Sequence, residues 1–545
     1  MTVNIAETLA EVAALHGDKT GVIEARTGRR LSFSQLNGRA DGFAAYLRDQ
    51  GVGPGERVML MVSPSADFIC LAFALFKLGV TIILIDPGMG YRNLLRCIAG
   101  VKPTVFIGVP KARLFAALSA GTFTTVKRWF CCGNSLGLFG PDIRGQLNAA
   151  PAPFPVYAPT ADDLAAIIFT TGSTGPPKGV RYEHGIFAAQ LARIRDYYGI
   201  DGDHIDQPAF PLFALFSASL GACSVIPDMD PTRPAAVDPA RFVGSIERYG
   251  VTYSFGSPAI WNVVSRYCLH RNIRLNSLGK VLMAGAPVPG DLLERMTAIL
   301  PDNARIFTPY GATESLPIVS MEAKEILQST WPRSRRGEGT CVGRPLPGIR
   351  VRIMAVQDEP VALYDEARML ATGKIGEIIV QGDVVTRAYQ NNPRETALAK
   401  IADPDGQGFW HRLGDTGYLD DIGRLWFCGR RAHRVVTASG TLYTIPCEAI
   451  VNEHPAVYRS ALVGVRQKGE CYPRPVMIVE PVKGYRGTKT KLLAEVEELA
   501  AASSLTSGIT CFLIHRRFPV DIRHNAKIFR EKLAVWAARQ LRVRS

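Results

Sequence analysis

The N-terminal part of the chain alternates short apolar runs with segments whose apolar residues recur at helical spacing. Asn4 precedes such a segment, which predicts a capped helix from Ile5 to His16. Residues 22–23 and 31–33 predict a hairpin, and the next helix is expected from Ser34 to about Arg48.

A strand–helix–strand unit follows, with strands predicted at 57–62 and 81–85 and a helix at 66–78. The same alternation recurs around Ile167 and at residues 281–283 and 305–307. Uninterrupted apolar strands between helices are typical of parallel sheets that are covered on both faces, so an α/β fold is expected.

The pattern changes after about Gly373, where residues 376–382 and 424–427 predict antiparallel strands joined by Gly and Asp turns. A compact α+β segment follows from Arg430, and its last helix, from about Ile528, carries an apolar stripe that favours core packing over membrane anchoring. Since 545 residues exceed one compact core, we expect a large domain, 1–429, and a small one, 430–545.

Composition indicates an ordinary globular protein, with 47% hydrophobic and 21% charged residues. The start of the chain lacks a secretory pattern, and the most apolar window, residues 70–85, is shorter than the roughly 20 residues of a spanning helix. Eleven scattered cysteines without a C-x-x-C pair suit a reducing compartment. We therefore expect a soluble, cytoplasmic protein without a transmembrane segment.

The net charge of +14 is spread along the chain and is densest over residues 523–544. Nucleic-acid binding would call for a concentrated basic stripe and a recognisable module, and neither is present. An anionic ligand, an acidic partner protein or a membrane surface is the favoured counterpart.

One glycine-rich and hydroxyl-rich stretch lies between the apolar run 164–169 and the helical pattern of 185–198. Such a loop can direct backbone N–H groups and hydroxyls at a polyphosphate, while a lysine adds positive charge. It lacks the P-loop spacing, and the alternative is a flexible linker. The candidate phosphate-binding residues are Thr170, Thr171, Gly172, Ser173, Thr174, Gly175 and Lys178.

This pattern, ending in Pro177-Lys178-Gly179, resembles the phosphate-binding signature of the adenylate-forming enzymes, which include acyl-CoA synthetases, luciferases and peptide-synthetase adenylation domains. The resemblance covers nearly the whole chain. It implies a large domain of parallel sheets with a small barrel-like β subdomain, a smaller mobile α+β domain that carries a catalytic lysine, and the use of ATP and Mg²⁺.

Residues 310–314 match a second family motif. The resemblance implies that Tyr310, beside Gly311 and Ala312, stacks on adenine, that Thr313 contacts the α-phosphate and that Glu314 helps to hold Mg²⁺, a hard cation that prefers oxygen ligands. Without the family, Thr-Glu after a strand would be a plain helix cap. The loop of Gly285, Ala286 and Pro287 resembles the loop at the adenine edge.

Residues 412–418 resemble the ribose-binding stretch of the family, in which the carboxylate of Asp415 would accept hydrogen bonds from the ribose hydroxyls. The alternative is a turn aspartate. Gly429-Arg430 matches the next motif, whose arginine also reaches the ribose. Two residues later the usual hinge Asp or Lys is replaced by Ala432, which puts a family-typical domain swing in doubt.

The C-terminal motif also departs from the family pattern, but Lys527 remains and is the candidate catalytic lysine, with a solvated helix start as the alternative. His524 is a weaker candidate for a general base. The segment 210–216 resembles the lining of the acyl site. The acyl-site candidates, each equally compatible with core packing, are Phe213, Ala214, Phe216 and Trp261.

Three features together resemble one branch of the family, the olefin β-lactone synthetases of bacterial long-chain olefin biosynthesis. They are the C-terminal motif at residues 519–528, the phenylalanine-rich segment 210–216 and Ala432. This implies a long-chain 2-alkyl-3-hydroxy acid substrate and assembly with other enzymes of olefin biosynthesis. Two alternatives remain open: a long-chain acyl-CoA ligase, and a non-catalytic nucleotide-binding partner in a multi-enzyme assembly.

Overall fold

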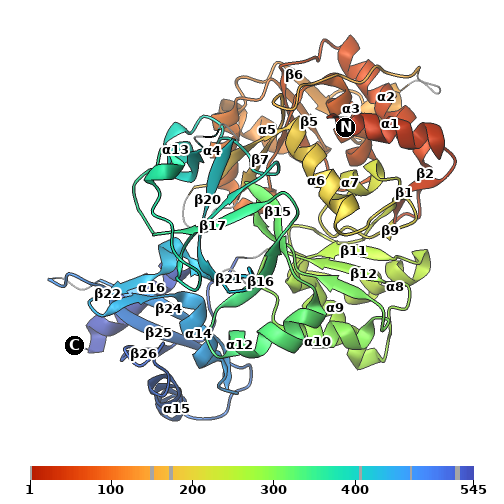
Figure 1. Cartoon of the computed structure of the whole chain (residues 1–545). Helices are drawn as coiled ribbons and strands as arrows, with labels where there is room; N and C mark the ends of the chain where they lie inside the picture. The colour runs from red at the N-terminus through yellow and green to blue at the C-terminus, as the bar shows by residue number, and fades with distance from the viewer. Residues whose placement is uncertain are drawn as a thin grey trace.

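The computed structural model describes residues 3–147, 152–170, 176–403, 405, 408–466, 469–521 and 528–544. Three sheets and their helices form the larger part of the molecule, and a smaller α+β unit follows toward the C-terminus, drawn in blue in Figure 1. This arrangement confirms the predicted fold class.

The first sheet has six strands in the order β6-β5-β3-β4-β7-β8, all parallel except β8, which is antiparallel to β7. Its strands are β3 (Arg57–Met61), β4 (Thr81–Leu84), β5 (Val105–Gly108), β6 (Arg128–Cys131), β7 (Leu164–Thr170) and β8 (Lys178–Glu183). The helices beside it are α1 (Ile5–Leu15), α2 (Phe33–Asp49), α3 (Ala66–Leu78), α4 (Tyr91–Val101), α5 (Pro110–Leu118) and α6 (His184–Asp196).

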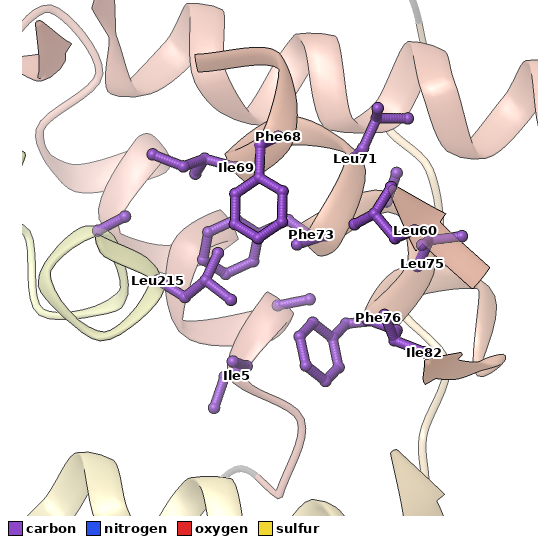
Figure 2. Close-up of a cluster of buried hydrophobic side chains, with 14 of the residues drawn as sticks. Ile5, Leu60, Phe68, Ile69, Leu71, Phe73, Leu75, Phe76, Ile82 and Leu215 are labelled. Carbon is purple, nitrogen blue, oxygen red and sulfur yellow. The ribbon is translucent and has the colours of Figure 1, made fainter. Parts of the chain in front are cut away.

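Successive residues of a strand point to opposite faces, and this sheet is covered on both. Leu60 and Ile82 pack into a core with α2 and α3, which Figure 2 shows around Phe73 and Phe76. Met59 and Ile83 pack on the opposite face with residues of α4 and α5.

Helix α3 explains the most apolar window of the sequence. All thirteen of its residues are buried, because the helix lies inside the core rather than on a surface. Its one cation, Lys77, forms an ion pair with Asp41 and donates a hydrogen bond to Asn37 at 2.8 Å. In the part of the chain that the structure describes, no helix has the length and apolarity needed to cross a bilayer.

The second sheet has the order β13-β12-β11-β9-β10-β1-β2, in which only the β1–β2 hairpin is antiparallel. Its strands are β1 (Thr20–Glu24), β2 (Arg30–Ser32), β9 (Ile205–Asp206), β10 (Cys223–Ile226), β11 (Tyr253–Gly256), β12 (Lys280–Met283) and β13 (Arg305–Phe307). The helices of this region are α7 (Phe213–Ser219), α8 (Pro239–Tyr249), α9 (Pro258–Arg271) and α10 (Gly290–Ile299).

The third sheet is antiparallel and follows directly from the second, in the order β14-β15-β16-β21-β20-β18-β17 with β19 paired to β20. Its strands are β14 (Tyr310–Ala312), β15 (Ser315–Ser320), β16 (Thr340–Pro345), β17 (Arg350–Met354), β18 (Gly376–Gln381), β19 (Lys400–Ala402), β20 (Phe409–Leu419) and β21 (Leu425–Arg430). Short helices α11 (Ala323–Glu325), α12 (Trp331–Arg335) and α13 (Pro393–Ala399) accompany it.

The C-terminal unit contains a hairpin and a three-stranded sheet with three helices. These elements are β22 (Val435–Thr437), β23 (Gly440–Leu442), α14 (Thr444–Asn452), β24 (Val457–Val465), β25 (Arg474–Pro481), α15 (Lys489–Ala501), β26 (Phe512–Ile514) and α16 (Arg530–Arg544). Leu533 and Ala537 of α16 are fully buried against β24 and β25, so the apolar stripe of the last helix is core, as predicted.

Candidate active site

The predicted phosphate loop closes a β-hairpin. Strands β7 and β8 pair with Thr170 opposite Lys178, and helix α6 begins only after β8. Helix α6 begins close to the predicted residue 185, but strand β8 between the loop and the helix was not predicted, although alternating residues such as Val180 and Tyr182 carried a strand signal. Five candidate residues, 171–175, and the side chain of Thr170 lie outside the described residues.

Lys178 lies at the base of this hairpin and contacts a segment that leads into α13. Its ammonium forms an ion pair with Glu395 and lies 5.0 Å from the centre of the Tyr389 ring. The backbone holds this segment in place, since the N–H of Gln390 donates to the carbonyl of Gly179 at 2.7 Å. Residues 388–390 thus bring an aromatic ring beside the lysine of the phosphate loop.

Glu314 occupies the turn between β14 and β15, so the alternative of a helix cap is wrong. The Tyr389 hydroxyl donates to Glu314 Oε1 at 2.7 Å, and the backbone N–H of Thr386 donates to the Glu314 carbonyl at 2.9 Å. The carbonyl of Thr313 accepts a hydrogen bond of 2.5 Å from the buried Tyr182 hydroxyl. Both motif residues are therefore held by groups distant in sequence.

Burial shifts the ionisation of the groups around Glu314. Lys400 is buried and donates to the carbonyl of Thr386, and burial lowers its pKa to about 7, against the opposing charges of Glu314 and Glu183. Burial also raises the pKa of Glu183 and lowers that of His411 well below its usual range. The site is thus a region of low dielectric constant, in which an unpaired charge is strongly unfavourable.

Asp415 is buried within strand β20, so the alternative of a turn aspartate is wrong. The Tyr310 hydroxyl donates to Asp415 Oδ2 at 2.6 Å, and Arg430 Nη1 lies 2.9 Å from Asp415 Oδ1. Asp415 and Arg430 are cross-strand partners on β20 and β21. The register of two strands therefore fixes this ion pair.

Three motifs meet at this pair, of which residues 310–314 lie far in the sequence from residues 412–418 and 429–430. The charge of Asp415 is the largest cause that raises the pKa of Arg430, and Glu314 also contributes. Burial and the Asp415 carboxylate raise the pKa of Tyr310 well above its usual range. The structure thus brings the candidates Tyr310, Glu314, Asp415 and Arg430 together.

A buried ion pair holds strand β20. Arg412 and Glu377, both with side chains 1% exposed, form an ion pair of 2.7 Å between β20 and β18. Arg412 also donates to the carbonyl of Glu359 at 2.9 Å. Removing one partner of such a pair typically costs several kcal/mol, so the strand that carries Asp415 is firmly placed.

The Gly285-Ala286-Pro287 loop leaves the carboxyl end of β12, which pairs in parallel with β13. Tyr310 lies three residues beyond the end of β13, so the loop and the tyrosine leave the same edge of the sheet. Ligands of open α/β sheets commonly bind outside the carboxyl ends of the strands. Gly285 has a φ of +96°, a conformation that favours glycine.

The candidate acyl residues fall into two groups: Phe213 and Ala214, which lie at a ring stack and beside a pocket, and Phe216 and Trp261, which pack in the core. On α7, the Phe213 ring stacks on Phe255 with centres 3.7 Å apart, Ala214 lines an apolar pocket with Phe68 and Ile226, and Phe216 is buried in the core. Trp261 is fully buried and packs edge-to-face on Phe242. The core alternative therefore describes Phe216 and Trp261.

Two further predictions, Lys527 and His524, lie outside the described residues. By contrast, three residues with defined contacts to Glu314 or its neighbours were not predicted: Tyr389, Thr386 and Lys400. No spacing rule links them to the motif at 310–314. Nothing in the sequence marks residues 388–390 as neighbours of the phosphate loop. Their position is known only from their pairing with strand β8.

Comparisons with known proteins agree with this geometry. The family described as AMP-binding enzyme matches residues 9–390. An olefin beta-lactone synthetase of Stenotrophomonas maltophilia (strain K279a) is 43% identical, over 99% of this chain and 99% of the relative. A second olefin beta-lactone synthetase, from Xanthomonas campestris pv. campestris, is 44% identical over 94% of this chain and 91% of the relative.

A solved structure gives the same picture of the fold. The amide bond synthetase McbA from Marinactinospora thermotolerans matches with a TM-score of 0.79 at 21% identity, over 98% of this chain and 99% of that structure. The comparisons confirm the resemblance that the sequence motifs predicted.

The Tyr389–Glu314 contact generates a prediction. We expect Tyr389→Phe to lower acid-dependent ATP–pyrophosphate exchange by on the order of tenfold, because a hydrogen bond to a carboxylate is lost while the ring beside Lys178 stays. The matched control is Tyr418→Phe, which removes a 2.9 Å hydrogen bond to the Glu338 carbonyl. Equal exchange rates in the two variants would contradict a role for Tyr389 in positioning Glu314.

Proposed function

This chain belongs to the family of AMP-binding enzymes, and from that membership we propose that it works as an olefin β-lactone synthetase. As an ATP-dependent acid-activating ligase it releases AMP and pyrophosphate. The proposed substrate is a long-chain 2-alkyl-3-hydroxy acid, and the product is a β-lactone. The near full-length identity to two olefin beta-lactone synthetases carries this proposal.

The nucleoside is proposed to bind around the Tyr310–Asp415–Arg430 cluster. The Tyr310 ring would stack on adenine against the loop 285–287, and Asp415 would accept from the ribose hydroxyls. An ionised carboxylate offers about four acceptor sites, so Asp415 can bind ribose while it keeps its contacts to Tyr310 and Arg430. Arg430 would compensate the buried negative charge of Asp415 both before and after the ribose binds.

The triphosphate is proposed to bind the hairpin loop 170–175, with Lys178 as its cation and Thr313 at the α-phosphate. Lys178 has one carboxylate partner, Glu395, and both side chains are about one-third exposed, 30% and 33%. Phosphate oxygens can replace such a partner at small cost, because exposed ion pairs contribute little. The partly exposed lysine is therefore available to the nucleotide.

Glu314 fits the part of a magnesium ligand. Tyr389 bonds Oε1, and the structure gives Oε2 no partner among the described hydrogen bonds. In the described part of the chain, no group of three or more His, Cys, Asp or Glu side chains could hold a metal ion. This suits Mg²⁺, which commonly takes one or two carboxylates together with substrate phosphates and water. Bound there, Mg²⁺ would neutralise phosphate charge.

We further propose that residues 1–429 form the large nucleotide- and acyl-binding domain and that 430–545 form a small mobile domain with Lys527 as the catalytic lysine. Lys527 would stabilise the negative charge that develops between the carboxylate and the α-phosphate. The large antiparallel sheet ends with β21 at Arg430, within one residue of this boundary.

The reaction is proposed to proceed in two steps. A carboxylate oxygen attacks the α-phosphorus and pyrophosphate leaves, which gives a mixed acyl–AMP anhydride. The 3-hydroxyl oxygen of the same molecule then attacks the acyl carbon, its proton is lost, and AMP leaves with the former carboxylate oxygen. The nucleophile is already attached, so the protein need only fold the chain and exclude water.

Two further features bear on the acyl site and on the location of the protein. The pocket beside Ala214 is lined by apolar side chains and holds only about 20 Å³, so a long chain would require α7 or its neighbours to move. Ten of the scattered cysteines are buried, as expected of thiols that serve as small apolar side chains, which supports a cytoplasmic location. Assembly with other enzymes of olefin biosynthesis is part of the same proposal.

The role of Glu314 predicts the effect of removing its charge. We expect Glu314→Gln to lower acid-dependent pyrophosphate exchange by on the order of 10²–10³, since electrostatic support of the triphosphate is lost. Glu322→Gln, which breaks an exposed ion pair with Arg305, is the control and should exchange normally. Near-normal exchange in Glu314→Gln would contradict the proposal that Glu314 is a magnesium ligand.

Product analysis tests the proposed function. With ATP, Mg²⁺ and a long-chain 2-alkyl-3-hydroxy acid, we expect a β-lactone in the NMR spectrum without added CoA. The matched substrate without the 3-hydroxyl should stop at the adenylate, because its internal nucleophile is missing. An adenylate of the hydroxy acid that persists until CoA is added, and then leaves as a thioester, would make the chain an acyl-CoA ligase instead.

A further inference from the structure

One segment of the chain carries half of its net positive charge. Between Asp86 and Asp142 there is no acidic residue, but there are seven Lys and Arg residues, against a net charge of +14 for the whole chain. Five of these cations are exposed: Arg92, Arg96, Lys102, Lys111 and Lys127. Within the described part of the chain, none of the five forms an ion pair.

The same segment exposes large apolar side chains. Leu136 and Leu138 are 88% and 79% exposed, and Leu114 and Leu118 of α5 are 51% and 78% exposed. Leu136 and Leu138 lie in a connection without helix or strand, between β6 and residue 142. A single leucine with this exposure is common on protein surfaces. A group of four beside unpaired cations instead indicates an interaction surface.

Packing places these side chains on one side of the molecule. Helices α4 and α5 cover the same face of the first sheet, and Tyr91 of α4 packs on Phe115 of α5 with ring centres 5.6 Å apart. Arg92 and Arg96 are four residues apart on α4, and Lys111, Leu114 and Leu118 share one face of α5. These faces therefore point away from the sheet.

The leucine loop adjoins the same helix. The Arg113 guanidinium of α5 lies 5.5 Å from the centre of the Phe139 ring, one residue beyond Leu138. We define the basic–apolar surface as Arg92, Arg96, Lys111, Leu114, Leu118, Leu136 and Leu138.

We propose that the basic–apolar surface docks the protein on an anionic lipid bilayer. Cations attract anionic headgroups, and protruding leucines enter the boundary between headgroups and acyl chains. A fluid bilayer needs no matching shape, so it can accept leucines that are exposed separately from one another. Neither of the two described pockets is lined by a residue of this surface. The inference goes beyond the proposed function and uses no residue of the nucleotide site.

Flotation with lipid vesicles tests the proposal on the full-length protein, without ATP or acid. We expect binding to phosphatidylcholine vesicles that contain 30 mol% phosphatidylglycerol, little binding to phosphatidylcholine alone, and loss of binding as salt rises. The triple variant Arg92→Gln, Arg96→Gln, Lys111→Gln should bind on the order of 100-fold more weakly. Leu136→Ser with Leu138→Ser should weaken binding by on the order of tenfold or more.

Controls separate this surface from general charge and from misfolding. Lys483→Gln, Arg486→Gln, Lys489→Gln removes three exposed cations of the C-terminal unit, and Leu15→Ser removes a leucine that is 77% exposed on α1. Both controls should bind vesicles normally, and every variant should keep its pyrophosphate exchange rate. No binding to anionic vesicles, or equal losses in variants and controls, would overturn the proposal. The proposal would also be overturned if the surface bound an acidic protein but did not bind the vesicles.

Discussion

One buried carboxylate, that of Asp415, ties together the parts of the molecule that form the candidate site. A buried carboxylate needs an ion pair or hydrogen bonds, because an unpaired charge is costly in a region of low dielectric constant. Its partners are Tyr310, just after the last strand of the second sheet, and Arg430, the final residue of β21. All three residues lie on strands of the third sheet, β14, β20 and β21, so the cluster ties the strand that follows the second sheet to the strand that precedes the C-terminal unit.

A second set of contacts connects this cluster to the phosphate loop. Tyr389 places its hydroxyl on Glu314 and its ring beside Lys178, so one side chain spans the proposed metal and phosphate positions. Its place depends on pairing between residues 388–390 and β8. The chemistry proposed for the site thus rests on strand register as much as on the motif residues themselves.

The sequence predicted what local patterns can encode. Helix α3 was predicted with its observed ends, and the parallel sheets followed from apolar strands between helices. Strand β8 was missed because its first residues, Lys178 and Gly179, belong to the phosphate-loop motif, and Tyr389 because its contacts come from residues far along the chain. Motif resemblance placed Tyr310 and Asp415 in one site, but their direct hydrogen bond required the fold. The roles of Lys527 and residues 171–175 stay predictions.

The central claim is that the enzyme activates the carboxyl group and that the substrate's own hydroxyl displaces AMP. An ¹⁸O label in the 3-hydroxyl tests it directly by mass spectrometry of both products. The account predicts ¹⁸O in the lactone ring and unlabelled AMP, since the hydroxyl oxygen is the nucleophile. Label in AMP and an unlabelled ring would show that the hydroxyl leaves with the nucleotide, and would contradict the account.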